Sequence, residues 1–252
     1  MSKIVFITGA SSGIGESCAR KFASEGFKVI LNSRSTGKLE ALADELEKKY
    51  GAMCLILPFD VRDSQEAASA IGLLPEDWKS IDILINNAGL AVGVDKEHEG
   101  SMDEWDQMID TNIKALLSMT RMVVPGMVER GRGHIINIGS IAGDAAYPGG
   151  SVYCATKAAV KVLSDGLRID LVDTPLRVTN IKPGLVETNF SVVRFRGDKD
   201  KADNVYKGIG ALTGDDIADV AYFAASAPAH VQIAEVLVMP TYQATGTIVH
   251  RS

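Results

Sequence analysis

The stretch Thr8-Gly9-Ala10-Ser11-Ser12-Gly13-Ile14-Gly15 ends a short apolar run, Ile4–Thr8, and opens a segment, 13–25, that has the pattern of a helix. Glycines in such a turn let the backbone approach a phosphate, and the helix behind them offers unpaired N–H groups and a positive dipole end. The spacing is Gly-x-x-x-Gly-x-Gly rather than Gly-x-Gly-x-x-Gly, and a purely structural tight turn would also use glycines. Placed between a first strand and a first helix, the stretch predicts a dinucleotide-binding unit.

Short apolar runs alternate with longer amphipathic segments along nearly the whole chain. The expected strands are 4–8, 28–32, 53–58, 81–86, 133–139, 177–182 and 235–240. The expected helices are 13–25, 38–50, 64–73, 102–129, 152–171 and 215–225. This alternation is typical of parallel strands joined by right-handed crossovers. The sequence therefore predicts a single α/β domain over 1–252, with a Rossmann-like, doubly wound parallel sheet of about seven strands.

Composition narrows the range of functions. The chain has 252 residues, 46% of them hydrophobic, and a formal net charge of −6, so it can form a sizeable core and has no basic stripe for nucleic acid. No apolar run reaches the roughly 18 residues of a membrane helix, and the four histidines lack metal-ligand spacing. Three cysteines without a paired framework are typical of free thiols in a reducing compartment. We expect a cytoplasmic protein that acts on a small solute, without nucleic acid, membrane or metal.

The segment 184–214 breaks the alternation of strands and helices. It contains several lysines and arginines among acids and glycines, and it follows the sixth expected strand. Ligands of open α/β sheets bind beyond the carboxyl ends of the strands, so a long insertion there is a candidate lid over a substrate. A solvated surface loop would have the same charge content.

The end of the second expected strand indicates which dinucleotide fits. An NAD site normally places an acid there to accept from the ribose 2′-OH, whereas this chain reads Asn32-Ser33-Arg34-Ser35 and has no acid until Glu40. Arg34 can form charge-assisted hydrogen bonds to a 2′-phosphate, with Ser33 and Ser35 as further donors. A plain loop charge is the alternative for Arg34, but the pattern favours NADP.

Two further strand ends carry candidate cofactor residues. Asp60-Val61 follows the third expected strand, where it is placed to border an adenine ring. Asn86-Asn87-Ala88-Gly89 ends the fourth, where two amides can tie strand ends together. Ala88 and Gly89 leave room there for a flat cofactor.

Tyr153 and Lys157 stand four residues apart on an expected helix, so both project from one face. Ser140 closes the fifth expected strand, and Asn112 lies in the helix before that strand. A Tyr-x-x-x-Lys pair on an exposed helix arises easily by chance. Together with Ser140, Asn112 and the glycine-rich turn, however, the pair predicts a catalytic site.

These motifs resemble the motif set of the short-chain dehydrogenases/reductases, in the family's order and over most of the chain. The matching positions are 8–15, 86–89, Asn112, Ser140, 153–157 and 183–184. More narrowly, 86–90, 127–143, 183–197 and 227–231 resemble the NADP-dependent 3-hydroxy acid dehydrogenases, which act on serine and allo-threonine. The resemblance implies cofactor-binding roles for Gly9, Ser11, Ser12, Gly13, Ile14, Gly15, Ser33, Arg34, Ser35, Asp60, Val61, Asn87, Ala88, Gly89, Tyr153, Lys157, Pro183, Gly184, Val186 and Thr188.

The resemblance also implies a mechanism, in which hydride passes between NADP(H) and the 3-hydroxyl or 3-oxo position of a small 3-hydroxy acid such as serine, allo-threonine or 3-hydroxypropionate. Tyr153 would be the base in oxidation and the acid in reduction. The positive charges of Lys157 and the oxidised nicotinamide would lower its pKa from about 10 to about 7 or 8. Ser140 would hydrogen-bond the substrate oxygen, Lys157 would also bind the nicotinamide ribose, and Asn112 would hold a water that returns protons to bulk. Thr188 would donate to the nicotinamide amide or the pyrophosphate.

A 3-hydroxy acid also needs a cation for its carboxylate. Arg194 and Arg196 are the candidates in the expected lid, because guanidinium binds carboxylate bidentately and residues two apart on an extended segment point the same way. Charges facing solvent on a loop would give the same pattern, and Arg194 is preferred only slightly. Tyr147 is expected either to wall the substrate pocket or to serve in packing.

Two other functions stay open at this point. A short-chain reductase of a larger ketone or a sugar would keep the same chemistry, and a sensor would bind NADP without turnover. The presence of Ser140, Tyr153 and Lys157 weighs against a sensor, because a pure binder needs no proton donor. Relatives in the family are commonly tetramers, and the segment 152–171 carries small apolar residues that suit a subunit contact, so we expect a homotetramer.

Overall fold

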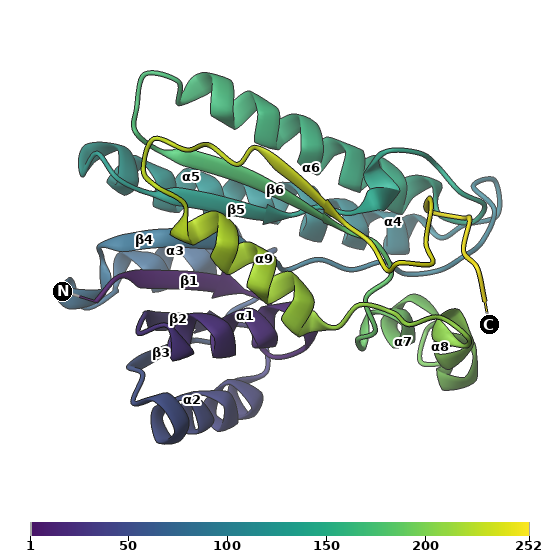
Figure 1. Ribbon diagram of the computed structural model, residues 1–252, viewed down its shortest axis with the longest axis horizontal. Helices are drawn as coiled ribbons and strands as arrows, with labels where there is room; N and C mark the ends of the chain where they lie inside the picture. The colour runs from purple at the N-terminus through teal and green to yellow at the C-terminus, as the bar shows by residue number, and fades with distance from the viewer. Residues whose placement is uncertain (1, 252) are drawn as a thin grey trace.

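The computed structural model describes residues 2–251. Its strands form one seven-stranded parallel sheet, with helices packed on both faces (Figure 1). The strands are β1 (Ile4–Thr8), β2 (Lys28–Asn32), β3 (Cys54–Leu57), β4 (Ile81–Asn86), β5 (His134–Ile138), β6 (Arg177–Pro183) and β7 (Glu235–Val238). They lie in the order β3-β2-β1-β4-β5-β6-β7. The chain starts in the middle of the sheet, builds outward to one edge, then returns and builds to the other. This confirms the predicted doubly wound, Rossmann-like domain.

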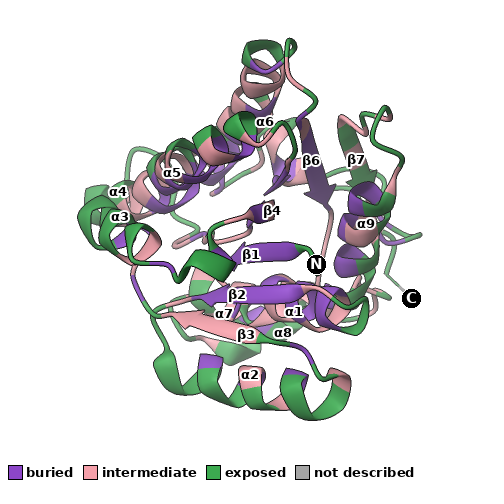
Figure 2. Cartoon of the chain, turned by 90° about the vertical axis from the view of Figure 1, so that its left-hand side faces the viewer, coloured by how far each residue is buried: buried purple, intermediate pink, exposed green. Residues whose placement is uncertain are grey.

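Helices cover both faces of the sheet (Figures 1 and 2). They are α1 (Gly13–Ser24), α2 (Thr36–Tyr50), α3 (Ser64–Gly72), α4 (Met102–Ile109), α5 (Ala115–Glu129), α6 (Ser151–Asp170), α7 (Phe190–Arg194), α8 (Lys199–Tyr206) and α9 (Gly214–Ser226). One apolar cluster joins α1, α2 and α9 to the sheet, and a second joins α3 and α5 to its other face, on which α6 also packs. The strands β1, β2 and β5 are buried along their whole length, as strands covered on both sides must be.

The helix expected over 102–129 is divided in the structure. Between α4 and α5, the segment Asp110–Lys114 forms a π-helical turn, which contains the buried residues Thr111 and Asn112. Such wide turns inside helices occur frequently at functional sites. The regular apolar spacing of 102–129 gave no sign of this turn.

The segment 184–214 contains the short helices α7 and α8, and a bridge between Val186 and Leu212 joins its two ends. Ser191 and Ala202 are buried within it. The segment lies beyond the carboxyl end of β6, at the same end of the sheet as the glycine-rich turn (Figure 1). It is thus a folded cap of two helices rather than a plain solvated loop.

Candidate active site

A cavity of about 610 Å³ opens at the carboxyl ends of the strands. Its volume is within the range of small-molecule and cofactor sites. Twenty-two of the predicted site residues line it: Gly9, Ser11, Ser12, Gly13, Ile14, Ser33, Arg34, Ser35, Asp60, Val61, Asn87, Ala88, Gly89, Ser140, Tyr147, Tyr153, Lys157, Pro183, Gly184, Val186, Thr188 and Arg194. The two others, Gly15 and Asn112, lie behind the wall.

The glycine-rich turn has the backbone geometry that its glycines suggest. Gly9 and Gly13 have φ angles of 66° and 56°, a region that L side chains rarely adopt. Thr188 closes over this turn from the other side of the cavity, because its Cγ2 would lie 3.1 Å from a Cβ on Gly13. Thr188 therefore lies close to the N-terminus of α1, where the backbone N–H groups favour an anionic group.

Gly15 was expected to bind the cofactor, but the structure places it behind the turn. A Cβ there would lie 2.4 Å from the carbonyl oxygen of Gly9 and 2.5 Å from Nδ2 of Asn87. The absence of a side chain lets α1 approach the turn closely. Gly15 thus supports the site through packing instead of lining it.

Asn87 fixes the end of β4 against the glycine-rich turn. Its Nδ2 donates to the carbonyl oxygens of Thr8 (2.9 Å) and Gly9 (3.2 Å). In return, the hydroxyl of Thr8 accepts from the backbone N–H groups of Asn87 and Ala88, both at 3.0 Å. This is one of the ties between strands that the paired amides predicted, and the side chain of Asn86 forms another, to Oδ1 of Asn137 in β5.

Arg34 lies at the far end of the cavity with a side chain that is 64% exposed. It is 3.9 Å from Asp60, but Asp60 is held more closely by Arg62, at 2.7 Å. Hydrogen bonds from Arg62 lower the pKa of Asp60, which keeps this carboxylate ionised and neutralised by Arg62. Arg34 therefore offers its guanidinium to a ligand, and Arg62, which was not predicted from the sequence, lines the cavity while paired with Asp60.

Tyr153, Ser140 and Lys157 converge on the middle of the cavity. Burial raises the pKa of Tyr153, and hydrogen bonding by Ser140 opposes this rise. Nζ of Lys157 donates to the carbonyl oxygen of Ile138 at 2.8 Å and lies 5.9 Å from the centre of the Tyr153 ring. Burial lowers the pKa of Lys157 to about 8. The direction found for Tyr153 is opposite to the expected lowering, because burial outweighs the favourable charges that the chain itself supplies.

Asn112 is buried, and its side-chain amide is committed to the protein. Oδ1 accepts from the backbone N–H of Leu90 at 2.9 Å, and Nδ2 donates to the carbonyl of Leu90 (2.8 Å) and to the hydroxyl of Thr156 (3.0 Å). The side chain thus joins the π-helical turn, the loop after β4 and helix α6. Its role in holding a water stays a prediction.

Arg194 and Tyr147 form the wall of the cavity beside Tyr153. Nη1 of Arg194 donates to the hydroxyl of Tyr147 at 2.9 Å, and the guanidinium lies 5.0 Å from the centre of the Tyr147 ring. Nε of Arg194 is buried without a hydrogen-bond partner among the described residues 2–251. An unpaired buried donor on a cation is costly. The guanidinium group belongs to a residue that lines the cavity, where it is available to an anionic ligand.

Arg196 does not share this position, contrary to the expectation of an extended segment. Arg194 ends helix α7, and Arg196 follows in a left-handed turn with a φ angle of 55°. Its guanidinium forms ion pairs with Asp95 and Glu104 on the outside of the site. Of the two arginines, Arg194 lines the cavity and Arg196 does not, and the role of Arg194 as the carboxylate ligand stays a prediction.

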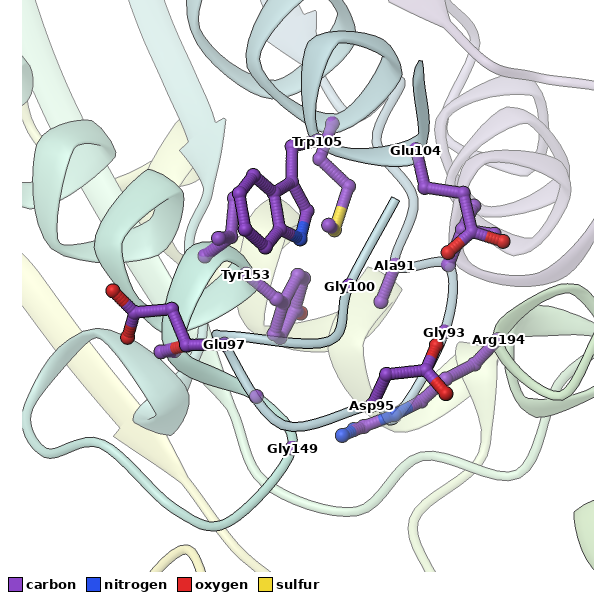
Figure 3. A pocket seen from close by; sticks show the side chains of 15 residues that line it. Ala91, Gly93, Asp95, Glu97, Gly100, Glu104, Trp105, Gly149, Tyr153 and Arg194 are labelled. Atoms are coloured by element: carbon purple, nitrogen blue, oxygen red, sulfur yellow. The ribbon is translucent and has the colours of Figure 1, made fainter. Parts of the chain in front are cut away.

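A second, smaller cavity lies behind Tyr153 and Arg194 (Figure 3). Its volume is about 20 Å³, roughly enough for one water molecule. Trp105 and Met108 of α4 form its apolar side, whereas Asp95 and Glu104 stand at its rim. It is too small for a substrate.

The cavity also has walls that the motifs did not predict. These are contributed by, among others, Leu90, Phe190, Tyr206, Gln243 and Arg251. Gln243 is buried and accepts from the backbone N–H of Leu185 at 2.8 Å, across 58 residues of sequence. No local pattern marks Gln243 and Arg251, because only the tertiary fold brings them to the site.

Between residues 2 and 251, no three or more His, Cys, Asp or Glu side chains gather as they would around a metal ion. Over the same residues, no helix has both the length and the apolar character needed to cross a membrane.

Comparison with known proteins agrees with this geometry. A family profile described as short chain dehydrogenase matches residues 3–199. The chain is 50% identical over 251 residues to the NADP-dependent 3-hydroxy acid dehydrogenase YdfG of Salmonella typhi, covering 99% of this chain and 100% of that protein. It is 47% identical over 250 residues to the NADP-dependent 3-hydroxy acid dehydrogenase of Schizosaccharomyces pombe, covering 99% and 96%.

Among solved structures, the closed form of serine dehydrogenase complexed with NADP+ superposes with a TM-score of 0.92. That protein is 47% identical, and the match covers 99% of this chain and 100% of the other. The chain thus belongs to the short-chain dehydrogenase family, and it is an oxidoreductase.

Proposed function

We propose that this protein is an NADP-dependent dehydrogenase of small 3-hydroxy acids. The observation that carries the substrate class is the cationic Arg194, which lines the same cavity as Tyr153 and whose Nη1 donates to a neutral hydroxyl, that of Tyr147. A carboxylate on the carbon next to the reacting one would pair with this guanidinium. The 3-hydroxy acid dehydrogenases similar to the chain support the same substrate class.

The cavity fits NADP by the chemistry of its donors. The left-handed Gly9 and Gly13 open the N-terminus of α1 to a pyrophosphate, and the exposed guanidinium of Arg34 is free for a 2′-phosphate. Lys157 and Thr188 line the same cavity and would hold the nicotinamide and its ribose. When bound, NADP supplies the hydride acceptor of the oxidation.

Within the chain, Tyr153 holds and moves the proton. In oxidation its phenolate takes the proton of the substrate hydroxyl, and in reduction its phenol returns one. Ser140 donates to the substrate oxygen, for which its hydroxyl is positioned at the start of a short 3-10 turn, where it also accepts from the N–H of Ala142 at 3.0 Å. Lys157 contributes its charge and a donor near the phenol.

The test is reduction of NADP by the purified protein with L-serine, L-allo-threonine and 3-hydroxypropionate as substrates. Turnover of at least one, with NAD much less effective, is the expected result. Negligible turnover of all three would contradict the proposed substrate class. It would instead favour a reductase of another carbonyl compound, such as a larger ketone or a sugar.

We also propose a homotetramer in the cytoplasm. Exposed apolar side chains lie on two separate parts of the surface, Val162 and Ile169 on α6 and Phe223 and Leu237 on α9 and β7. Two distinct contacts are what a tetramer of dihedral symmetry requires. Cys18, Cys54 and Cys154 carry free thiols, which suits a reducing compartment. Light scattering after gel filtration tests the tetramer, and cell fractionation tests the location.

A further inference from the structure

A chain of buried hydrogen bonds links the neighbouring strands β4 and β5 to helix α6, close to the active site. Nδ2 of Asn86 donates to Oδ1 of Asn137 at 2.9 Å, and Nδ2 of Asn137 donates to the hydroxyl of Ser164 at 2.9 Å. That hydroxyl in turn donates to the carbonyl oxygen of Val160 at 2.7 Å. Asn137 and Ser164 are 1% and 0% exposed, so water does not compete for these bonds.

Each element in this chain of hydrogen bonds carries part of the site. Asn86 directly precedes Asn87 at the end of β4, and Asn137 lies in β5, three residues before Ser140. Ser164 lies in α6, two helical turns after Lys157 and on the same face. Asn86 also donates to the hydroxyl of Thr120 on α5, at 3.2 Å.

Helix α6 is bound to β5 by polar contacts at two successive residues of the strand. The side chain of Asn137 holds Ser164, and the carbonyl oxygen of Ile138 accepts from Lys157 at 2.8 Å. Apolar packing alone tolerates small sliding of a helix along a sheet, whereas a hydrogen bond fixes both distance and direction. A shift of about 1 Å at reacting groups can cost roughly a hundredfold in rate.

We propose that Asn137 and Ser164 are positioning residues of the reaction, whose hydrogen bond sets where α6 presents Tyr153 and Lys157 to Ser140. The kinetic part of this inference rests on the proposed function. Neither residue lines the cavity, so any effect on turnover acts through the helix.

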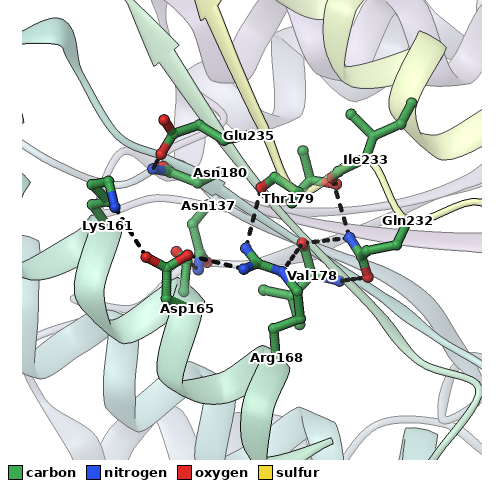
Figure 4. A network of polar contacts seen from close by, with 12 residues as sticks. Asn137, Lys161, Asp165, Arg168, Val178, Thr179, Asn180, Gln232, Ile233 and Glu235 are labelled. Atoms are coloured by element: carbon green, nitrogen blue, oxygen red, sulfur yellow. Dashed lines mark hydrogen bonds and ion pairs between the residues drawn. The ribbon is translucent and has the colours of Figure 1, made fainter. Parts of the chain in front are cut away.

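The far half of α6 has an independent anchor. Arg168 donates to the carbonyl oxygens of Val178 (3.4 Å) and Ala234 (3.2 Å) and pairs with Asp165 at 2.9 Å (Figure 4). We therefore expect the helix to stay docked when the hydroxyl of Ser164 is removed. The variant Ser164→Ala should therefore fold, and it should differ from wild type only in how firmly the N-terminal half of α6, which carries Tyr153 and Lys157, is held against β5.

Thr179 offers a matched control. Like Ser164, its hydroxyl contacts one buried side-chain nitrogen, Nε2 of His134 at 2.8 Å, and donates to one backbone carbonyl, that of Ile233 at 2.7 Å. Strand alternation places Thr179 on the opposite face of the sheet from α6. Thr179→Val thus removes a comparable pair of buried hydrogen bonds without touching the helix.

The experiment compares wild type, Ser164→Ala, Ser164→Thr and Thr179→Val. We expect Ser164→Ala to lower kcat by roughly tenfold or more and to displace the pH profile of kcat, while the Kd for NADPH stays within about threefold. Thr179→Val should lower the melting temperature about as much as Ser164→Ala does, but it should keep the kcat and the pH profile of wild type. Ser164→Thr retains the hydroxyl and should recover most of the activity.

Amide hydrogen exchange of peptides covering 151–158 supplies a readout that needs no substrate. Exchange there should be faster in Ser164→Ala than in Thr179→Val. Equal exchange, or equal kcat and pH profiles in the two variants, overturns the positioning role. A wild-type protein that turns over no 3-hydroxy acid refutes the proposed function alone, because the exchange comparison still decides the role of Asn137 and Ser164.

Discussion

Lys157 donates its hydrogen bond to the carbonyl of Ile138, at 2.8 Å, and its Nζ lies 5.9 Å from the ring centre of Tyr153. The ammonium is therefore fixed by the backbone of β5 rather than by the phenol. Since burial lowers the pKa of Lys157 to about 8, its charge declines as the pH rises through that value. If Lys157 supports a phenolate at Tyr153 as proposed, that support weakens as the pH rises above about 8.

Replacing Tyr153 with Phe should abolish most of the oxidation. The phenol is the only proton-transfer group that the proposed mechanism places at the substrate, so kcat should fall by about 10² to 10⁴-fold. The Kd for NADPH, measured by fluorescence, should remain close to that of wild type. Retained NADPH-linked turnover in Tyr153→Phe would contradict the assignment. A sensor that only binds the nucleotide would lose nothing in this variant.

Replacing Arg194 with Met should raise KM for 3-hydroxy acids. Loss of a charge-assisted hydrogen bond costs about 1.5 to 3 kcal/mol, or roughly 10- to 100-fold in KM. Arg196→Met is the matched control, because Arg196 pairs with Asp95 and Glu104 outside the cavity. Initial-rate kinetics of both variants, with L-serine and with an uncharged alcohol, show whether the rise in KM is specific to Arg194→Met and to the charged substrate. A similar rise in KM for both variants would argue against Arg194 as the carboxylate ligand.

Replacing Arg34 with Ala should weaken NADP binding without weakening NAD binding. The guanidinium is exposed at the end of the cavity, and Asp60 is occupied by Arg62. We expect the Kd for NADP to rise by roughly tenfold or more, as for a lost phosphate contact, and the ratio of NAD to NADP activity to increase. Equal changes for both nucleotides would show that Arg34 does not read the 2′-phosphate.

Replacing Gly15 with Ala should lower both stability and cofactor affinity, because the added Cβ would lie 2.4 Å from the carbonyl of Gly9. Relief requires moving the glycine-rich turn or helix α1. Gly37→Ala is the control, since a Cβ on Gly37 in helix α2 meets no atom within 4 Å. That change should be neutral or stabilising by about 0.5 to 1 kcal/mol. Thermal melts with and without NADP measure both effects.

His134 should make the protein sensitive to acid. Burial, aided by Arg177, lowers its pKa to about 3, whereas the unfolded chain has a histidine pKa of about 6.5. Between these values the unfolded state binds a proton that the folded state does not. The free energy of unfolding is therefore not reduced by His134 above about pH 6.5, and it decreases as the pH falls from there toward 3. In urea unfolding, the free energy of unfolding of His134→Gln should decrease less between pH 7 and pH 5 than that of the wild type. The exposed His98→Gln should behave as wild type does.

Local patterns in the sequence predicted the parts of the site that depend on neighbouring residues. Tyr153 and Lys157 share a helix face by their spacing, and the turn around Gly13 follows its strand directly. The doubly wound parallel sheet also followed from the alternation of strands and helices. These features need only short-range geometry and the handedness of crossovers, which act on any chain of this kind.

Other parts could not be predicted because long-range packing decides them. The separation of Arg194 from Arg196 depends on helix α7 ending between them, and the π-helical turn around Asn112 interrupts a segment whose apolar spacing suggests one regular helix. The rise in the pKa of Tyr153 comes from burial, which is a property of the folded molecule. Gly15 follows a motif but serves packing, since the approach of α1 to Gly9 is not visible in a spacing.

The cavity is closed by residues from Gly9 near one end of the chain to Gln243 and Arg251 near the other. During synthesis, the N-terminal strands β1 to β4 would therefore leave the ribosome long before Gln243 and Arg251, which complete the cavity wall, are made. Because buried Gln243 supports the backbone at Leu185, nascent or prematurely terminated polypeptides lacking it should be catalytically silent even if they fold in part. We therefore expect the cavity to be complete only after the C-terminal segment has been synthesised.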